Sequence, residues 1–255
     1  MVKYYQSARM MCLAKLNGGI LGMLPDLFIK ACTLIAQIYV WRSVMMSGVD
    51  VDMTMPQMLS YAYLSVMLSD LMVVETQASG WLSEGVLMKM YGRPLSVLGQ
   101  LAAETVGRWI PTLLLFSLPM ALVSPWIGVS LVPATYWFWV SLVLCVSLGF
   151  AMDFMFACLS IKLRNMNWLV SRIRLGITAL FSGAVIPIQL LPEGVGRVML
   201  YQPFASMGGA PLSLFVGSMD PGRIIPLQLL WNIVLWPAAL LICKKSQEGM
   251  VSYGG

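Results

Sequence analysis

Histidine is absent from all 255 residues of the chain. This absence removes the commonest metal ligand, the commonest general base and any histidine-ligated haem. The sequence also lacks GxxxxGKS, GxxxxGKT and GxSxG, so it has neither a phosphate-binding P-loop nor a nucleophile elbow. Paired carboxylates would still allow enzyme chemistry, but the acidic residues do not gather in one place. The sequence therefore predicts a protein that is not an enzyme and holds no metal or cofactor of its own.

Charged residues are scarce, at 11% of the chain, while hydrophobic residues make up 59%. Soluble domains average about a quarter charged residues, and no stretch of this chain is polar enough to fold as a separate soluble domain. The composition predicts an all-α integral membrane protein in which residues 1–255 form a single transmembrane domain.

Redox and nucleic-acid motifs are missing too. The chain has no CxxC pair, and its cysteines are expected to be small buried hydrophobes. The net charge of +5 is spread among apolar segments without an aromatic-interleaved patch, which argues against nucleic acid as a partner. Most of the 21 methionines lie in apolar segments, where methionine is adaptable packing rather than a copper ligand.

Apolar windows predict six transmembrane helices of about 20 residues each. They lie at roughly 19–41, 56–74, 109–130, 134–160, 168–190 and 222–243. In this arrangement the side that holds both termini collects twelve basic residues, namely Lys3, Arg9, Lys15, Lys89, Arg93, Arg108, Lys162, Arg164, Arg172, Arg174, Lys244 and Lys245. The other side has Arg42, Arg197 and Arg223. The positive-inside rule then predicts a multi-pass protein of the inner (plasma) membrane with both termini in the cytoplasm.

The apolar stretch from residue 185 to residue 211 is interrupted by four prolines, Pro187, Pro192, Pro203 and Pro211. A seventh span through residues 198–217 would place prolines at membrane depth, where lipid cannot replace the lost backbone hydrogen bonds. We expect residues 191–221 to form an extracellular re-entrant helical hairpin between spans five and six. Such backbone is tolerated only where protein or a water-filled cavity covers it, which indicates the outer mouth of a transport path.

The cytoplasmic side offers two further segments. Residues 1–17 predict an amphipathic helix on the membrane surface, with an apolar face of Tyr4, Tyr5, Ala8, Met11, Cys12 and Leu16 that Lys15 interrupts. Residues 75–108 form the longest polar stretch and are predicted to be a cytoplasmic loop that docks a partner.

Charges inside predicted spans are functional candidates because each is costly at mid-membrane. Asp26 and Lys30 are spaced i,i+4 and are expected to pair with each other. Asp70 and Glu75 close the second span and are expected to reach cytoplasmic water. Asp153 leaves two readings open: it pairs with Arg172 or Arg174 across helices, or it lines the transport path.

The stretch LFSGAVIPIQLLPEGVGRVMLYQPFASMGGAPLSLFVG carries a recognisable pattern. A Ser-Gly pair is followed by two spaced prolines, a Pro-Phe pair and a small-residue turn; the positions are Ser182, Gly183, Pro187, Pro192, Pro203 and Phe204. In this pattern the sequence resembles the type-2 ABC exporter permeases, in particular the six-span ABC-2 family transporter proteins. Weaker matches are YVWRS, GRPLS and the closing SYGG, and the similarity extends over nearly the whole chain.

The resemblance implies the membrane subunit of an ABC transporter that exports an amphipathic substrate such as a drug, a peptide or a lipid-like molecule. Its partners would be two ATPase subunits, which bind ATP and Mg, and a second permease subunit, identical or homologous. The segment containing Pro187, Pro192, Pro203 and Phe204 would close an extracellular gate. The loop between spans two and three would hold a coupling helix that contacts the ATPase. Two alternatives from other classes stay open: a membrane-embedded assembly factor and a stand-alone ion-coupled transporter that uses Asp153.

We predict that replacing Leu87 by Asp weakens recovery of the ATPase without preventing membrane insertion. A short helix around residues 82–90 combines apolar anchors with charged side chains, as a docking surface does, and Pro94 ends it. The proposed contacts are Trp81, Leu82, Glu84, Leu87, Lys89 and Arg93. The measurement is the amount of ATPase that co-purifies with the inserted permease. Undiminished ATPase recovery and coupled transport would refute this docking assignment.

Overall fold

The protein is all-helical over the residues that its computed structural model describes, which are 2–17, 19–48, 53–76, 95–162 and 167–251. The α-helices in chain order are α1 (Val2–Asn17), α2 (Gly19–Met46), α3 (Met55–Met67), α4 (Ser69–Met72), α7 (Val97–Thr112), α8 (Leu118–Val123), α9 (Trp137–Lys162), α10 (Asn167–Phe181), α11 (Glu193–Tyr201), α12 (Gly209–Val216) and α13 (Pro221–Val251). Short π and 3-10 turns join them at Leu113–Ser117, Ser124–Ile127 and Ile188–Leu190.

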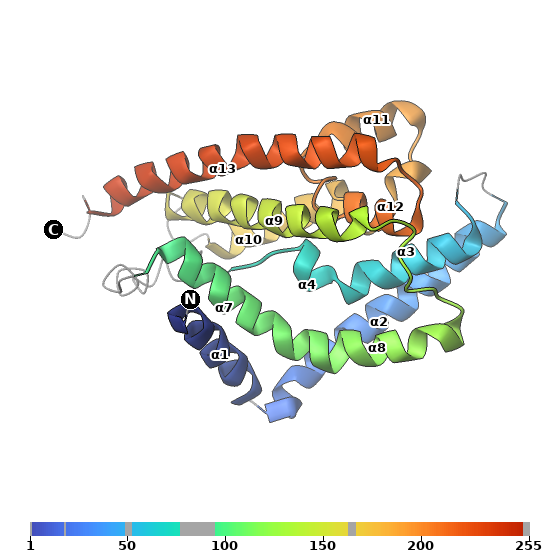
Figure 1. Ribbon diagram of the computed structural model, residues 1–255, viewed down its shortest axis with the longest axis horizontal. Helices are drawn as coiled ribbons and strands as arrows, with labels where there is room; N and C mark the ends of the chain where they lie inside the picture. Colours follow the sequence, from blue (N-terminus) through green and yellow to red (C-terminus); the bar gives the residue numbers. More distant parts are fainter. Residues whose placement is uncertain (1, 18, 49–52, 77–94, 163–166, 252–255) are drawn as a thin grey trace.

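Four helical stretches are long and apolar enough to cross a membrane, and this confirms the membrane-protein prediction at that level. They are Leu21–Met46, Val97–Ile127, Trp137–Leu159 and Pro221–Lys245. The other two predicted spans correspond to shorter helices, because α3 ends after 13 residues and α10 after 15. Figure 1 shows that α2, α3, α7 with α8, and α9 run in alternating directions, so that successive helices return across the length of the molecule.

Helix α9 is the centre of the bundle. It is apolar around its whole circumference, and α13 packs beside it along most of its length (Figure 1). The two helices run parallel, and polar side chains of α13 fix their register. Gln228 donates to the Ser141 carbonyl at 3.3 Å, Asn232 donates to the Leu144 carbonyl at 3.2 Å, and Trp236 donates to the Ser147 hydroxyl at 2.9 Å.

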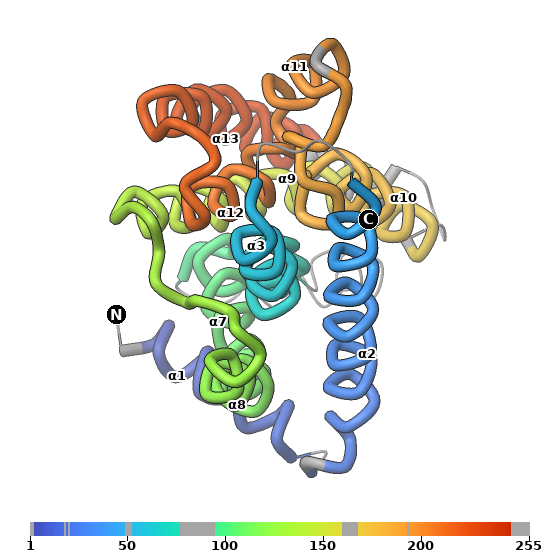
Figure 2. Tube along the Cα trace, turned by 90° about the vertical axis from the view of Figure 1, so that its right-hand side faces the viewer, coloured from blue at the N-terminus to red at the C-terminus, as the bar shows by residue number. Residues whose placement is uncertain are grey.

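Helix α1 packs along most of the length of α7 (Figure 2). The two backbones approach closely at Gly107, where an added Cβ would lie 2.2 Å from the Ala8 carbonyl oxygen. Lys15, which interrupts the predicted apolar face, bonds to α7. Its ammonium donates to the Thr112 hydroxyl at 2.8 Å and to the Arg108 carbonyl at 3.3 Å. Tyr5 and Leu16 of the predicted face are exposed, so the contact of this face with a membrane stays a prediction.

Helix α7 begins at Val97, so residues 97–108 of the segment predicted as a loop are helical. Ser96 caps this helix by accepting a hydrogen bond from the Gly99 amide at 3.2 Å. Residues 77–94 lie outside the described residues. The proposed docking side chains Trp81, Leu82, Glu84, Leu87, Lys89 and Arg93 lie among them, so their docking role stays a prediction.

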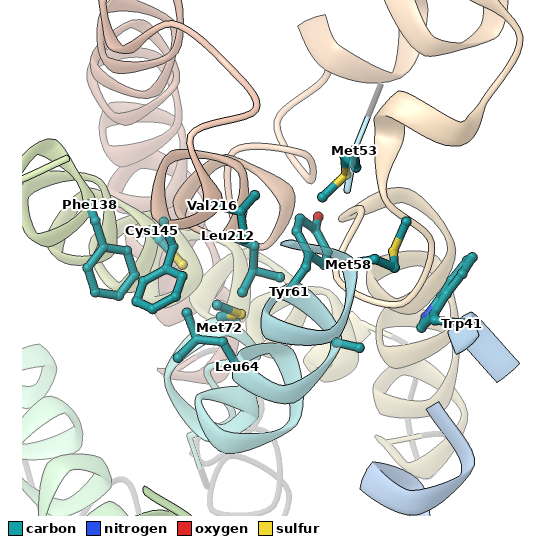
Figure 3. Close-up of a cluster of buried hydrophobic side chains, with 12 residues drawn as sticks. Trp41, Met53, Met58, Tyr61, Leu64, Met72, Phe138, Cys145, Leu212 and Val216 are labelled. Atoms are coloured by element: carbon teal, nitrogen blue, oxygen red, sulfur yellow. The ribbon is translucent and has the colours of Figure 1, made fainter. Parts of the chain in front are cut away.

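Helix α12 is short and every one of its eight residues is buried. It lies between α3 and α9, and Figure 3 shows Leu212 and Val216 beside Tyr61 of α3, with Phe138 and Cys145 of α9 on the other side. Gln57 joins the ends of two helices: its side chain accepts from the Thr54 amide at 2.9 Å and donates to the Val216 carbonyl at 3.0 Å. A helix that buries every residue is a core element rather than a surface loop.

The close contact at Gly107 generates a test. Gly107→Ala should lower the apparent Tm by about 5 °C, because the new methyl group must push α1 away from α7. The matched control is Gly176→Ala on α10, where an added Cβ meets nothing within 4 Å and alanine favours the helix. Thermal unfolding followed by fluorescence measures both variants. Equal stability of the two would contradict the packing described for α1.

Candidate functional site

The candidate site is built around a break in the helix that follows α3. The chain turns at Leu68, forms the single turn of α4, and then runs as extended backbone from Val73 to Thr76. The Val73 amide still donates to the Ser69 carbonyl at 2.8 Å, but residues 74–76 lie outside the helix, and Val74 and Thr76 are buried. In an apolar surrounding every such amide and carbonyl needs a partner from elsewhere in the protein.

Side chains from three other helices supply these partners. Arg174 of α10 donates to the Val74 carbonyl at 2.7 Å, and Arg108 of α7 donates to the Glu75 carbonyl at 2.8 Å. The amide of Thr76 donates to a carboxylate oxygen of Asp153 on α9 at 3.1 Å, and the Thr76 hydroxyl donates to the same oxygen. We call this set, Arg108, Asp153 and Arg174 holding residues 73–76, the clamp.

Two charges of the clamp, those of Asp153 and Arg174, are buried and compensate each other. Asp153 and Arg174 are 5% and 4% exposed, and the distance from the Arg174 guanidinium to the Asp153 carboxylate is 3.1 Å. Glu75 adds a second, looser carboxylate at 3.8 Å from Arg174, with its own side chain more than half exposed. Of the two readings for Asp153, the structure shows the pairing, with Arg174 rather than the exposed Arg172.

Close packing also fixes the extended segment against α9. An added Cβ at Gly149 would lie 2.5 Å from a methyl group of Val74, so glycine is required for this approach. One turn along the helix, Asp153 holds Thr76. Helix α9 therefore contacts the segment through both shape and charge.

In front of the clamp lies a cavity of about 330 Å³ between α2, α3 with α4, and α10. Its walls are apolar with hydroxyl, amide and ammonium groups placed at intervals. The lining residues are Lys30, Thr33, Gln37, Ser65, Val66, Ser69, Met72, Val73, Leu175, Ala179, Ser182, Ala184 and Val185. Pockets for amphipathic small molecules have this character, with mostly apolar walls and a few polar groups that orient the ligand. Asp153 is not part of the lining.

The ammonium of Lys30 is the charged group of this cavity. It lies 2.8 Å from a carboxylate oxygen of Asp70 and donates to the Ser69 hydroxyl at 2.9 Å. The expected pairing of Lys30 with Asp26 was therefore wrong, and Asp26 is exposed. The i,i+4 spacing made that pair possible, but the turn at Leu68 brings Asp70 to the same place from another helix, closer to the interior.

The cavity and the clamp share two structural elements. Val73 lines the cavity, while its neighbour Val74 is bound by the clamp. On α10, Leu175 lines the cavity, and the preceding residue Arg174 points into the clamp. A displacement of residues 73–76 would therefore change the cavity wall directly.

The predicted gate residues lie on either side of α11, away from the clamp. Pro187 and Pro192 are the residues before the 3-10 turn at Ile188–Leu190 and before α11. Pro203 and Phe204 occupy the turn between α11 and α12, where the Phe204 ring is 6.5 Å from that of Phe181. The structure thus brings Phe204 to the end of α10, while Pro192 is exposed.

The Ser-Gly and Gly-Gly pairs of this region meet backbone to backbone. The Gly209 amide donates to the Ser182 carbonyl at 2.5 Å, and Gly183 has a positive φ of 76°. Tyr61 donates to the Gly183 carbonyl at 2.6 Å, and Gln202 donates to the Phe181 carbonyl at 2.5 Å. Small residues are needed because a side chain at either glycine would separate the two segments.

Sequence reasoning missed Thr76, Arg108, Tyr61 and Gln228 as structural partners. The signal was present for Gln228, a polar residue spaced i,i+4 from Asn232 within an apolar span. Thr76 and Arg108 gave no signal, because each acts on a helix break that only the fold reveals. No protein-family model and no curated protein matches the chain.

We predict that Asp153→Asn lowers the apparent Tm by about 10 °C, because it leaves the Arg174 guanidinium buried without its compensating charge. Glu75→Gln is the matched control and should change the Tm by less than about 2 °C, since Glu75 is exposed and more distant. The double variant Asp153→Asn, Arg174→Gln should be more stable than Asp153→Asn alone. An Asp153→Asn protein as stable as the parent would contradict the clamp.

Proposed function

We propose that the chain is the permease subunit of an ABC transporter of the type-2 exporter kind. Its cavity would form part of the path for an amphipathic substrate, driven by a separate ATPase. The observation that carries this proposal is the cavity between α2, α4 and α10, which combines apolar walls with spaced polar groups and one ammonium. The resemblance of the block from Ser182 to Phe204 to such permeases supports the same function.

We infer that the protein lies in the inner membrane and crosses it six times. Both termini would then lie in the cytoplasm. The alternating directions of the helices support this, and α3 with α4 and α10 would complete the crossings together with the non-helical residues that follow each. Lys244 and Lys245 lie at the end of the apolar part of α13. Helix α9 ends on the same side of the molecule. Residues 191–221 would then enter the outer leaflet as a re-entrant hairpin, with the buried α12 as its inner part.

The ATPase would act through the segment that follows the clamp. Thr76 is the last described residue before the predicted docking segment, and it is held by Asp153. A force applied beyond Thr76 would reach α9 and α10 through the clamp and would move the wall of the cavity at Val73.

A second permease subunit would close the open side of the cavity. Helix α2 packs against α3 on one side, but only 11% of its apolar window is buried, and Figure 2 shows it at the edge of the molecule. Its outward residues include Phe28, Ile29, Ile35 and Tyr39. The lining itself favours a cargo that combines an apolar body with a polar or charged group, which Lys30 and Asp70 would orient.

We predict that Ala179→Trp abolishes export while the ATPase still co-purifies, because the indole fills the cavity without touching the docking segment. Leu122→Trp on α8 is the control, since Leu122 is 70% exposed and lies outside the cavity. Proteoliposomes containing the complex and a fluorescent amphiphile measure export. Wild-type export by Ala179→Trp would refute the assigned path, and purification from native membranes without any nucleotide-hydrolysing subunit would refute the ABC assignment.

A further inference from the structure

Two cysteines from distant parts of the sequence meet near the ends of α9 and α13. The Sγ atoms of Cys158 and Cys243 are 2.8 Å apart, although 85 residues separate the two positions. Neither cysteine is in a disulfide. A covalent S–S bond is about 2.05 Å long, so a small side-chain adjustment would bring the two sulfur atoms to bonding distance.

The surrounding helices hold the two thiols in register. Helices α9 and α13 form the most extensive helix pair of the described structure, and the hydrogen bond from Trp236 to Ser147 fixes them two turns before Cys243. The thiols therefore face each other as a consequence of the main packing interface. A chance encounter of two mobile side chains would lack this support.

Cys243 is the more accessible of the two thiols, and Cys158 is buried beside a surface hollow. A hollow of about 280 Å³ lies beside Cys158 and is lined by Met155, Phe156, Cys158, Leu159 and Ile242. Cys243 is partly exposed and is followed by the exposed residues Lys244 and Lys245. The thiolate is the form that attacks a disulfide.

We propose that Cys158 and Cys243 are a reversible oxidation site that forms an intramolecular disulfide with a small-molecule disulfide as the oxidant. The Cys243 thiol loses its proton to water, and its thiolate attacks one sulfur of the oxidant, releasing the other sulfur as a thiolate that takes up a proton. The Cys158 thiol then loses its proton, attacks the Cys243 sulfur of the mixed disulfide and releases the second small thiol. The two protein thiols are oxidised, and one small disulfide is reduced to two thiols.

The bond would tie the end of α9 to the end of α13. Cys158 lies little more than one helical turn beyond Asp153, so the disulfide would restrain the part of α9 that carries the clamp. In a reducing cytoplasm the thiols stay free, and an oxidising shift closes the bond. The site follows from the thiol geometry alone and does not depend on the transport function proposed above.

The test uses the full-length purified protein in detergent, reduced and then exposed to oxidised glutathione. We expect the intact mass to fall by two hydrogen atoms, with a peptide that joins Cys158 to Cys243 and with mass and free thiols restored by dithiothreitol. The apparent Tm of the oxidised protein should rise by about 5 °C, because the bond closes a long loop of the unfolded chain.

Variants separate this pair from the other cysteines. Cys158→Ser and Cys243→Ser should each prevent the loss of two hydrogens, whereas Cys32→Ser, at an exposed position on α2, should leave it intact. The decisive reading is made on the unaltered protein, so a poorly folding variant does not affect it. A glutathione adduct that persists on Cys243, a bond that maps to other cysteines, or two thiols that stay free would each overturn the proposal.

Discussion

Backbone that leaves the helix inside an apolar environment must find every hydrogen bond elsewhere in the protein, and this constraint organises the molecule. Among the described residues, the chain leaves the helix in the interior after α3, after α10 and again in the turn before α12. At the first break, Ser117 donates to the Met67 carbonyl at 2.8 Å, and the clamp holds the residues beyond it. At the second, Tyr61 and Gln202 donate hydrogen bonds to the carbonyls of Gly183 and Phe181 at the end of α10. The buried ion pair of Asp153 and Arg174 serves the first of these breaks, whereas uncharged side chains serve the second.

The breaks also create the features on which a transport function would depend. A continuous helix in place of α3 and α4 would carry Asp70 elsewhere, and Lys30 would lack its partner. An unbroken helix after Phe181 would remove the backbone contact between Ser182 and Gly209 that positions the buried α12. The polar groups of the cavity and the small residues of the turn therefore have the same origin. Rigid, long helices on either side provide the frame against which these segments can shift.

Periodicity and composition predict the long helices of this fold, but they do not predict which side chains pair between helices. Helix α9 is apolar on all sides apart from a few polar residues such as Asp153, so its position in the centre follows from its sequence. The ion-pair partner of Lys30 cannot be read from the sequence in the same way. A carboxylate four residues away on the same helix and one on another helix would both neutralise its charge. Likewise, Lys15 interrupts the apolar stripe of α1, and only the fold shows that the Thr112 hydroxyl lies beside it as a hydrogen-bond partner. The cysteine pair escapes prediction for the same reason, since spacing along the chain says nothing about two parallel helices in register.

Helix α9 links these observations in one element. Its first half receives the side chains of Gln228 and Asn232 from α13, its middle carries Asp153, and its end carries Cys158. Apolar residues alone would let two smooth helices slide, because lipid competes equally well for such surfaces. Polar contacts at fixed intervals resist sliding, so α9 and α13 behave as one rigid unit. Residues 73–76 are bound to that unit on one side and to α10 on the other, so relative movement of α10 must be accommodated at the ion pair between Asp153 and Arg174.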